Sequence, residues 1–365
     1  MPTTLPARRR WSSFSLRSLL ALVTLAAVGF AWVASEWRQS HYEFQVVQQL
    51  RATNERADVR WGGSFDPPED FAPLGAGVGQ GTKPSWWRQS LSRLCGQRVY
   101  GLDVFGNSQV TDLAPLARLK SLISLDVSRT PVTDFSPLGR LASLQRLNLY
   151  QTKIDDLAPV ARLKNLKHLS FGGTPVRDLS PLAGLNLLES VELHDTLVTD
   201  IAALAGLSEG LRSLVLNGTQ VHDLSPLAGL KNLGSLQAER TPVTDISPLA
   251  SLDRLAGLKL NGTRVADVVP LAGLKNLSHL YLADTQITDI TPLTRISGLK
   301  FLWLDRAPIS DLSPLLYLRE LSMVHLDGSQ LGEQINSLKR RMPNCTIYCD
   351  NLPQSVSAAQ QQQDD

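Results

Sequence analysis

The chain has 365 residues, a formal net charge of +2 and 43% hydrophobic residues. It is long enough to bury a sizeable core, and its near-neutral charge argues against a dedicated nucleic-acid-binding protein. The six histidines and three cysteines have no metal-ligand spacing, and no nucleophile elbow, kinase motif or phosphate-binding loop is present. The sequence therefore predicts a non-enzymatic protein without cofactor, metal or small-molecule substrate.

The N-terminal segment places positive charge before an uncharged run. Residues 1–18 contain Arg8, Arg9, Arg10 and Arg17, whereas residues 19–35 contain no charged side chain. Such a run is just long enough to cross a bilayer, and the arginines favour a cytoplasmic N-terminus. We expect a basic cytoplasmic segment (1–18) and a transmembrane signal anchor (19–35). The protein would then be single-pass in the cell membrane, with the rest of the chain on the exported (periplasmic or extracytoplasmic) side. A cleaved signal peptide is the alternative, and it exports the chain as well.

The next segments change composition twice. Residues 36–85 are predicted to form a juxtamembrane helix followed by a linker rich in Gly and Pro. Residues 86–98 contain Trp86 and Trp87 in an amphipathic pattern. They stand where a stack of repeats needs an N-terminal cap over its first core face.

Residues 99–331 repeat one short unit about eleven times. Leu144, Leu147 and Leu149 are followed 22 residues later by Leu166, Leu169 and Phe171. The alternation of apolar residues within each unit is typical of a strand with one buried face. An aspartate recurs at the same step, with one step of 23, at residues 112, 134, 156, 178, 200, 223, 245, 267, 289 and 311.

This L-x-x-L-x-L unit with a 22-residue period resembles the leucine-rich repeats of bacterial internalins. The resemblance implies an α/β solenoid, a leucine-rich-repeat horseshoe. The transmembrane helix expected at residues 19–35 would precede it. A parallel sheet would form its concave face and short 3₁₀ or helical turns its convex face. Related repeats often carry Asn after the strand, so the resemblance also implies that Thr satisfies backbone groups there through its hydroxyl. These threonines are residues 130, 152, 174, 196, 219, 241, 263 and 285.

The second half of each unit reads Asp-Leu-Ser-Pro-Leu. We interpret the aspartates as structural, with carboxylates that accept backbone N–H groups at the turn into a short 3₁₀ helix. Ser225, Ser247 and Thr291 precede a proline and are predicted to be N-cap residues.

The repeat pattern decays after Leu331. Residues 332–352 are predicted to form a C-terminal cap with an amphipathic helix and a final strand, and residues 353–365 a disordered tail. Cys345 and Cys349 lie four residues apart in this cap. An exported compartment permits a disulfide, but bridging them requires a turn, so both a bridge and two free thiols stay open.

One surface of the predicted sheet stands out. In the last three repeats the solvent-facing positions are large or acidic, and adjacent strands lie about 4.8 Å apart, so the side chains should be contiguous. We predict that they bind a protein partner, because exposed aromatic clusters often mark interaction sites. An envelope scaffold or adhesin-like protein without one specific partner is the alternative. The predicted partner-binding residues are His279, Tyr281, Phe301, Trp303, Asp305, Met323, His325 and Asp327.

Overall fold

The computed structural model describes residues 16–53, 58–63, 97–327 and 331–350. Most of the predicted N-terminal cap and linker, the tail and Cys95 lie outside these ranges. The chain forms two compact units, one of residues 1–49 with 60–99 and one of residues 50–59 with 100–365.

The first unit contains most of helix α1 (Leu16–Thr53), a single helix of 38 residues. It passes without a break through Ser35, where the predicted membrane segment was expected to end. Within the described residues, no helix is both long and apolar enough to cross a membrane. The predicted transmembrane helix at residues 19–35 is therefore not found.

A buried carboxylate organises part of this first unit. Glu43 in α1 accepts hydrogen bonds from the backbone N–H of Val99 (2.8 Å) and from Nη1 of Arg98 (3.1 Å). Arg98 also pairs with Glu36, which lies about two turns before Glu43 on the same side of α1. Because a buried charge is costly unless it is paired, these partners explain how Glu43 can be fully buried.

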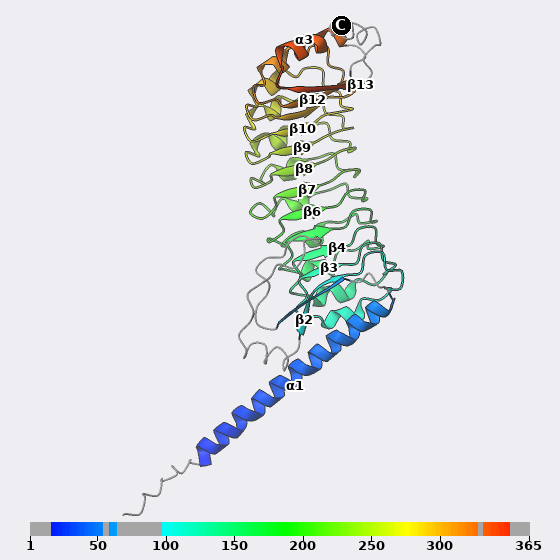
Figure 1. Cartoon of the computed structure of the whole chain (residues 1–365), viewed down its shortest axis with the longest axis vertical. Helices are drawn as coiled ribbons and strands as arrows, with labels where there is room; N and C mark the ends of the chain where they lie inside the picture. The colour runs from blue at the N-terminus through cyan, green and yellow to red at the C-terminus, as the bar shows by residue number, and fades with distance from the viewer. Residues whose placement is uncertain (1–15, 54–57, 64–96, 328–330, 351–365) are drawn as a thin grey trace, which may run out of the picture. The chain divides into compact units, whose positions relative to one another are not determined.

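The second unit is a stack of coils built from strands and 3₁₀ helices in alternation (Figure 1). Thirteen strands among the described residues form one sheet in sequence order, and all but the first two lie wholly within this second unit. They are β1 (Asp58–Gly63), β2 (Gln97–Asp103), β3 (Ser124–Asp126), β4 (Arg146–Asn148), β5 (His168–Ser170), β6 (Ser190–Glu192), β7 (Ser213–Val215), β8 (Ser235–Gln237), β9 (Gly257–Lys259), β10 (His279–Tyr281), β11 (Phe301–Trp303), β12 (Met323–Asp327) and β13 (Thr346–Asp350).

A 3₁₀ helix follows each of the strands β2 to β11. These helices are η1 (Ala114–Arg118), η2 (Ser136–Arg140), η3 (Val160–Arg162), η4 (Ser180–Leu182), η5 (Ala202–Leu204), η6 (Ser225–Leu227), η7 (Ser247–Ser251), η8 (Val269–Gly273), η9 (Thr291–Arg295) and η10 (Ser313–Tyr317). The predicted solenoid with a parallel sheet and 3₁₀ turns is confirmed.

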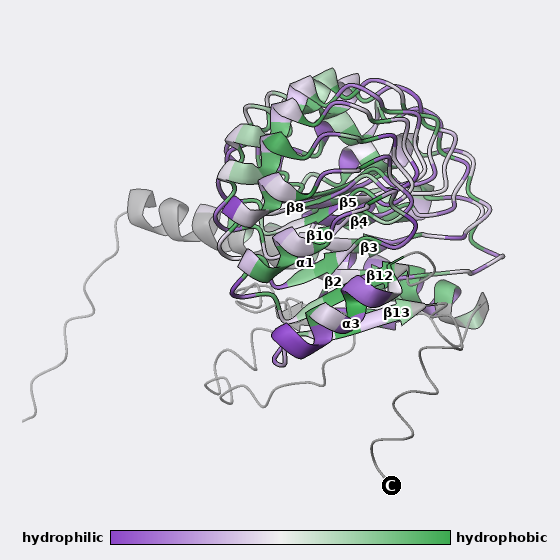
Figure 2. Ribbon diagram, turned by 90° about the horizontal axis from the view of Figure 1, so that it is seen from above, coloured by the Kyte–Doolittle hydropathy of each residue, from purple (hydrophilic) through white to green (hydrophobic). Residues whose placement is uncertain are grey.

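The core is a set of leucine columns that run through the stack. The strands from β2 to β13 pair in parallel, so Leu125, Leu147 and Leu169 lie in register and all are buried. The coils superimpose when the stack is seen from above (Figure 2). Each coil therefore buries its apolar side chains against its two neighbours, which is how a repeat protein builds a continuous core.

The threonine column does what the resemblance implied. In all eight repeats the Thr hydroxyl donates to the backbone carbonyl three residues earlier, at 2.6–2.8 Å, as from Thr219 to Leu216. All eight threonines are buried. Asn107 takes this place in the first coil, where its Oδ1 accepts the N–H of Gln109. The prediction is confirmed.

The aspartate column is also structural. At each of the ten positions a carboxylate oxygen accepts the N–H two residues later, at 2.7–2.9 Å, as in Asp223 with Ser225. The prediction of N-cap residues, however, was wrong by one position. Helix η6 begins at Ser225 itself, and its N-cap is Leu224, which makes no side-chain cap bond. Ser225 instead donates its hydroxyl to Asp223, so the aspartate supplies the acceptor expected of a capping serine.

After the last coil, helix α3 (Gly332–Arg341) precedes β13. Ile335 and Leu338 of α3 are buried. The amide of Gln334 accepts the N–H of Leu312 (2.9 Å) and donates to the carbonyl of Ser310 (2.8 Å). Cys345 and Cys349 are free thiols, and burial raises the pKa of Cys345.

Candidate functional site: an aromatic ladder on the sheet

The solvent-facing side chains of β9 to β13 form two columns. Each three-residue strand places its middle residue in the core and its first and third residues on the open face, as in β11, where Leu302 is buried between Phe301 and Trp303. Register pairs Tyr281 with Trp303 and Trp303 with His325. Third-position residues of successive repeats are thus brought side by side.

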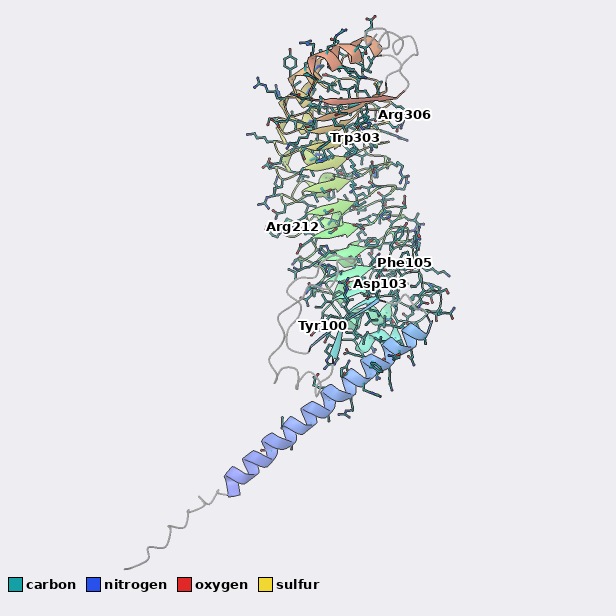
Figure 3. The ribbon with its side chains drawn as sticks, in the orientation of Figure 1. Tyr100, Asp103, Phe105, Arg212, Trp303 and Arg306 are labelled. Atoms are coloured by element: carbon teal, nitrogen blue, oxygen red, sulfur yellow. The ribbon has the colours of Figure 1, made fainter. Side chains whose placement is uncertain are left out.

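The third-position column is a continuous stack of rings, which we call the aromatic ladder: Tyr281, Trp303, His325 and Tyr348. The ring centroids of Tyr281 and Trp303 are 3.8 Å apart, with 9° between the planes. Trp303 and His325 follow at 5.2 Å and 13°, and His325 and Tyr348 at 4.6 Å and 18°. Four consecutive strands thereby present one series of stacked rings whose planes are nearly parallel. Figure 3 labels Trp303 on the sheet near its C-terminal end.

The first-position column is shorter and lies beside the ladder. The rings of His279 and Phe301 stack at 4.5 Å and 21°. Phe301 also contacts the ladder through Trp303 of its own strand, at 6.5 Å between centroids. Met323 continues this column in register with Phe301. The two columns together make one patch of seven side chains.

Two members of this patch were not predicted from the sequence. The Nζ of Lys259 in β9 lies 5.1 Å from the centroid of the Tyr281 ring and extends the ladder at one end through a cation–π contact. Tyr348 in β13 extends it at the other end and is 47% exposed. Tyr348 follows His325 by 23 residues across α3, outside the 22-residue phase, so only the observed pairing of β12 with β13 reveals it.

The two predicted acidic residues lie at the border of the patch. Asp305 follows β11, and its backbone carbonyl accepts the N–H of Asp284. Asp327 ends β12 and pairs in register with Asp350, and its side chain lies outside the described part of the structure. The structure thus brings His279, Tyr281, Phe301, Trp303, Met323 and His325 together and places the backbone of Asp305 and Asp327 beside them.

A polar network borders the ladder on the side of the earlier repeats. The carboxylate of Glu239 accepts hydrogen bonds from the amides of Asn217 (3.2 Å) and Asn261 (2.7 Å). Asn261 in turn accepts the N–H of Ala283, two residues after Tyr281. Burial, reinforced by the charge of Glu239, raises the pKa of the Tyr281 phenol. Tyr281 therefore remains a hydroxyl donor at all physiological pH values.

The stacking decides which part of each ring a partner can touch. The faces of Trp303 and His325 are covered by neighbouring rings, so mainly ring edges and polar tips remain towards solvent. Ring edges carry positive partial charge, and the Trp303 N–H and tyrosine O–H groups are donors. Such a surface suits apolar groups and hydrogen-bond acceptors, as in an extended peptide. It is poorly suited to ligands that must stack on a free ring face.

The earlier half of the sheet face has a different character. Arg129 lies between the rings of Phe105 (5.4 Å) and Tyr150 (5.5 Å). The ring of His194 leans across Gly172, where a side chain would overlap it, and comes within 5.4 Å of Tyr150. These contacts are cation–π contacts and one tilted ring pair, and they do not form a continuous stack of parallel rings.

No family model and no curated protein matches the chain. Solved structures do match. Internalin F from Listeria monocytogenes is 26% identical with a TM-score of 0.56, over 73% of this chain and 88% of that one. Internalin C2 from the same organism is 33% identical over 60% and 88%, with a TM-score of 0.46.

A plant structure shares the fold alone. The plant peptide hormone receptor RGFR1, solved in complex with RGF2, is 18% identical with a TM-score of 0.51, over 65% of this chain and 45% of that one. The repeat unit, the threonine and aspartate columns and the similarity to internalin F agree. This chain is a bacterial-type, internalin-like leucine-rich-repeat protein.

Proposed function

We propose that the chain is a non-enzymatic protein-interaction module that binds a protein partner through the aromatic ladder, with Trp303 at its centre. The observation that carries the proposal is the unbroken stack from Tyr281 to Tyr348 on an open sheet face. Large aromatic side chains held rigidly by their neighbours lose little conformational entropy on binding, and they dominate the energetics of many interfaces.

Three further observations support this proposal. The ladder residues face solvent although they are large, and Trp303 is only half-buried. The remaining described part of the sheet face has no comparable stack. A structural neighbour with this fold, the receptor RGFR1, was solved with RGF2 bound.

The test compares three full-length proteins: wild type, Trp303→Ala and Tyr150→Ala. Tyr150 lies on the same face in an earlier repeat and is the matched control. A protein captured from envelope extracts by wild type is identified, purified and titrated against all three. Hot-spot residues lose about 2 kcal/mol or more on truncation, so Trp303→Ala should weaken binding at least about 30-fold.

The control and the folding state decide the interpretation. Tyr150→Ala should change the affinity little, and both variants should unfold at nearly the wild-type temperature. Equal affinity of Trp303→Ala and wild type would show that the ladder is not the binding centre. Loss of folding in Trp303→Ala would assign the ladder to packing. Capture of many proteins at equal, weak affinity would favour the scaffold or adhesin-like alternative.

We further propose that the repeats act on the exported side of the cell membrane. The proposal is supported by the arginines of residues 8–17 and the uncharged run that follows. A reporter enzyme fused after Leu352 should be active only in the exported compartment, and cytoplasmic activity would overturn the assignment. Alkaline extraction of membranes tests attachment separately, because release of the full-length protein would exclude an anchor.

A further inference from the structure

The two lateral edges of the solenoid carry opposite charge. The post-strand loops connect each strand from β2 to β11 to the next 3₁₀ helix, and the pre-strand loops run from the last residue of each 3₁₀ helix to the next strand. The pre-strand loops contain 13 Lys or Arg and 4 Asp or Glu residues, a net charge of +9. The post-strand loops contain 6 Lys or Arg and 15 Asp or Glu residues, a net charge of −9. The overall charge of +2 conceals this separation.

The figures place these two sets of loops on opposite edges of the sheet. Arg212, in the pre-strand loop of β7, lies at one edge of the stack, and Arg306, in the post-strand loop of β11, lies at the other (Figure 3). Arg306 is paired there with the carboxylate of Asp284. The edge that bears Arg212 is therefore the one with excess positive charge.

The positive charge is densest in the first three pre-strand loops, which contain no acidic residue. Five exposed cations lie there, and we call them the basic cluster: Arg118, Lys120, Arg140, Arg162 and Lys164. Neighbouring loops are held together, since the amide of Asn165 donates to the carbonyl of Ala142 at 2.9 Å. Adjacent strands lie about 4.8 Å apart, so the loops that carry the cluster follow one another closely along one edge of the stack.

The acidic edge of a second copy is one conceivable partner for this line, but the energetics disfavour it. Both edges are solvated, and exposed ion pairs contribute little to association because water and salt screen them. A linear polyanion differs because its own charges have condensed counterions, and binding to a line of cations releases them with a gain in entropy. A polymer therefore gains more from this edge than another copy of the chain does.

The uncharged residues of the same loops indicate the class of polymer. The first three loops contain no aromatic residue, so they lack the platforms on which nucleic-acid bases stack. Beside the cations they offer hydroxyl and amide groups, from half-buried Ser121 and Ser143 and exposed Asn165. Such groups can bond to sugar hydroxyls. We propose that the basic cluster binds a linear acidic polysaccharide, at a site separate from the aromatic ladder.

The test uses the full chain and a fluorescent heparin oligosaccharide as the probe. Binding is measured by anisotropy at several NaCl concentrations. With five contacts, the slope of log K against log [NaCl] should be about −3.5, if each contact contributes about 0.7 to the slope as it does for single-stranded nucleic acids. The triple variant Lys120→Glu, Arg140→Glu, Lys164→Glu should lower the affinity at least tenfold and reduce the slope to about −1.4.

The matched control is Lys153→Glu, Arg177→Glu, Arg264→Glu, which changes the net charge equally. These three cations are exposed but lie in post-strand loops, so the control should bind heparin nearly as wild type does. Equal loss in both triple variants would show attraction by net charge alone and overturn the proposal. Tighter binding of double-stranded DNA than of heparin would overturn the polysaccharide assignment, as would equal binding of neutral dextran. Sedimentation velocity at 50 mM NaCl completes the test, because dimerisation abolished by the basic-cluster variant would assign the edge to self-association instead.

Discussion

Arg240 reaches Asp195 across an intervening coil. Its Nη2 lies 3.8 Å from a carboxylate oxygen two repeats earlier, and Gly218 stands between them in the same column. Residues of this column have positive φ, near 50–70°. At Gly218 an added Cβ would overlap the Asp195 carboxylate, so the glycine leaves open the space through which the two side chains meet.

Gly218→Ala should therefore destabilise the protein by about 1–2 kcal/mol, mostly through the left-handed backbone conformation. Six other coils hold a non-glycine residue in this conformation, so the change should not prevent folding. Gly229→Ala is the control, since a Cβ there meets nothing within 4 Å and φ is not positive. Urea unfolding measures both. Equal stabilities of the two variants would contradict the argument.

Leu214→Ala should cost about 2–5 kcal/mol, because the side chain is fully buried and its removal leaves a cavity between coils. Each coil contacts only its neighbours, so hydrogen exchange should accelerate first in β6, β7 and β8. Uniform acceleration along the whole stack would show instead that the solenoid unfolds as a single unit.

Thr219→Val should remove the hydroxyl bond to the Leu216 carbonyl with little change in volume. That carbonyl keeps the N–H of Thr219 as a donor, so the expected loss is about 1 kcal/mol rather than the cost of an orphaned group. Thr288→Val, at an exposed position, is the control and should be neutral. A neutral result at Thr219 would mean that the threonine column contributes by shape alone.

The aspartate column predicts an acid-sensitive solenoid. Bonds from the Ser180 hydroxyl and N–H lower the pKa of Asp178, and the Ser225 N–H and hydroxyl lower that of Asp223. A carboxyl whose pKa is depressed on folding stabilises the fold above its unfolded pKa of about 3.9, and this contribution disappears as the pH falls through the folded pKa.

The urea concentration at the unfolding midpoint of wild type should thus decrease as the pH is lowered below about 4. Replacement of Asp134, Asp178, Asp223 and Asp289 by Asn should flatten that decline, since an amide oxygen can accept the same N–H but does not titrate. Asp155→Asn, outside the column, is the control. An unchanged pH profile in the quadruple variant would assign acid sensitivity to other carboxylates.

Ending the chain at Ser329 should cause aggregation. The truncation removes Ile335 and Leu338, which are buried, and the Gln334 amide that bonds to Leu312 and Ser310. The last coil would then expose apolar surface and unpaired backbone groups. Light scattering after expression tests this, and a soluble, fully folded truncation would show that α3 and β13 are dispensable.

The features that could be predicted best from the sequence are those that recur in every repeat. The strand register, the threonine hydroxyl bonds and the aspartate turns recur because each coil packs between two coils of the same kind. The interactions derived for one repeat therefore apply to the others. A serine before proline is typical of an N-cap, but helix η6 begins at Ser225, and Asp223 two residues earlier accepts the N–H of Ser225. Tyr348 was missed since α3 breaks the phase, and Lys259 because a lysine carries no aromatic signal.

The last rung of the aromatic ladder, Tyr348, belongs to β13, beyond α3 and outside the repeating units. The element that closes the stack thus also completes the candidate binding surface. A gain or loss of whole 22-residue units among the earlier coils would lengthen or shorten the solenoid and leave this surface intact. The same event between β10 and β13 would rebuild the ladder with other side chains. Variation in repeat number is therefore tolerable at one end of the protein and consequential at the other.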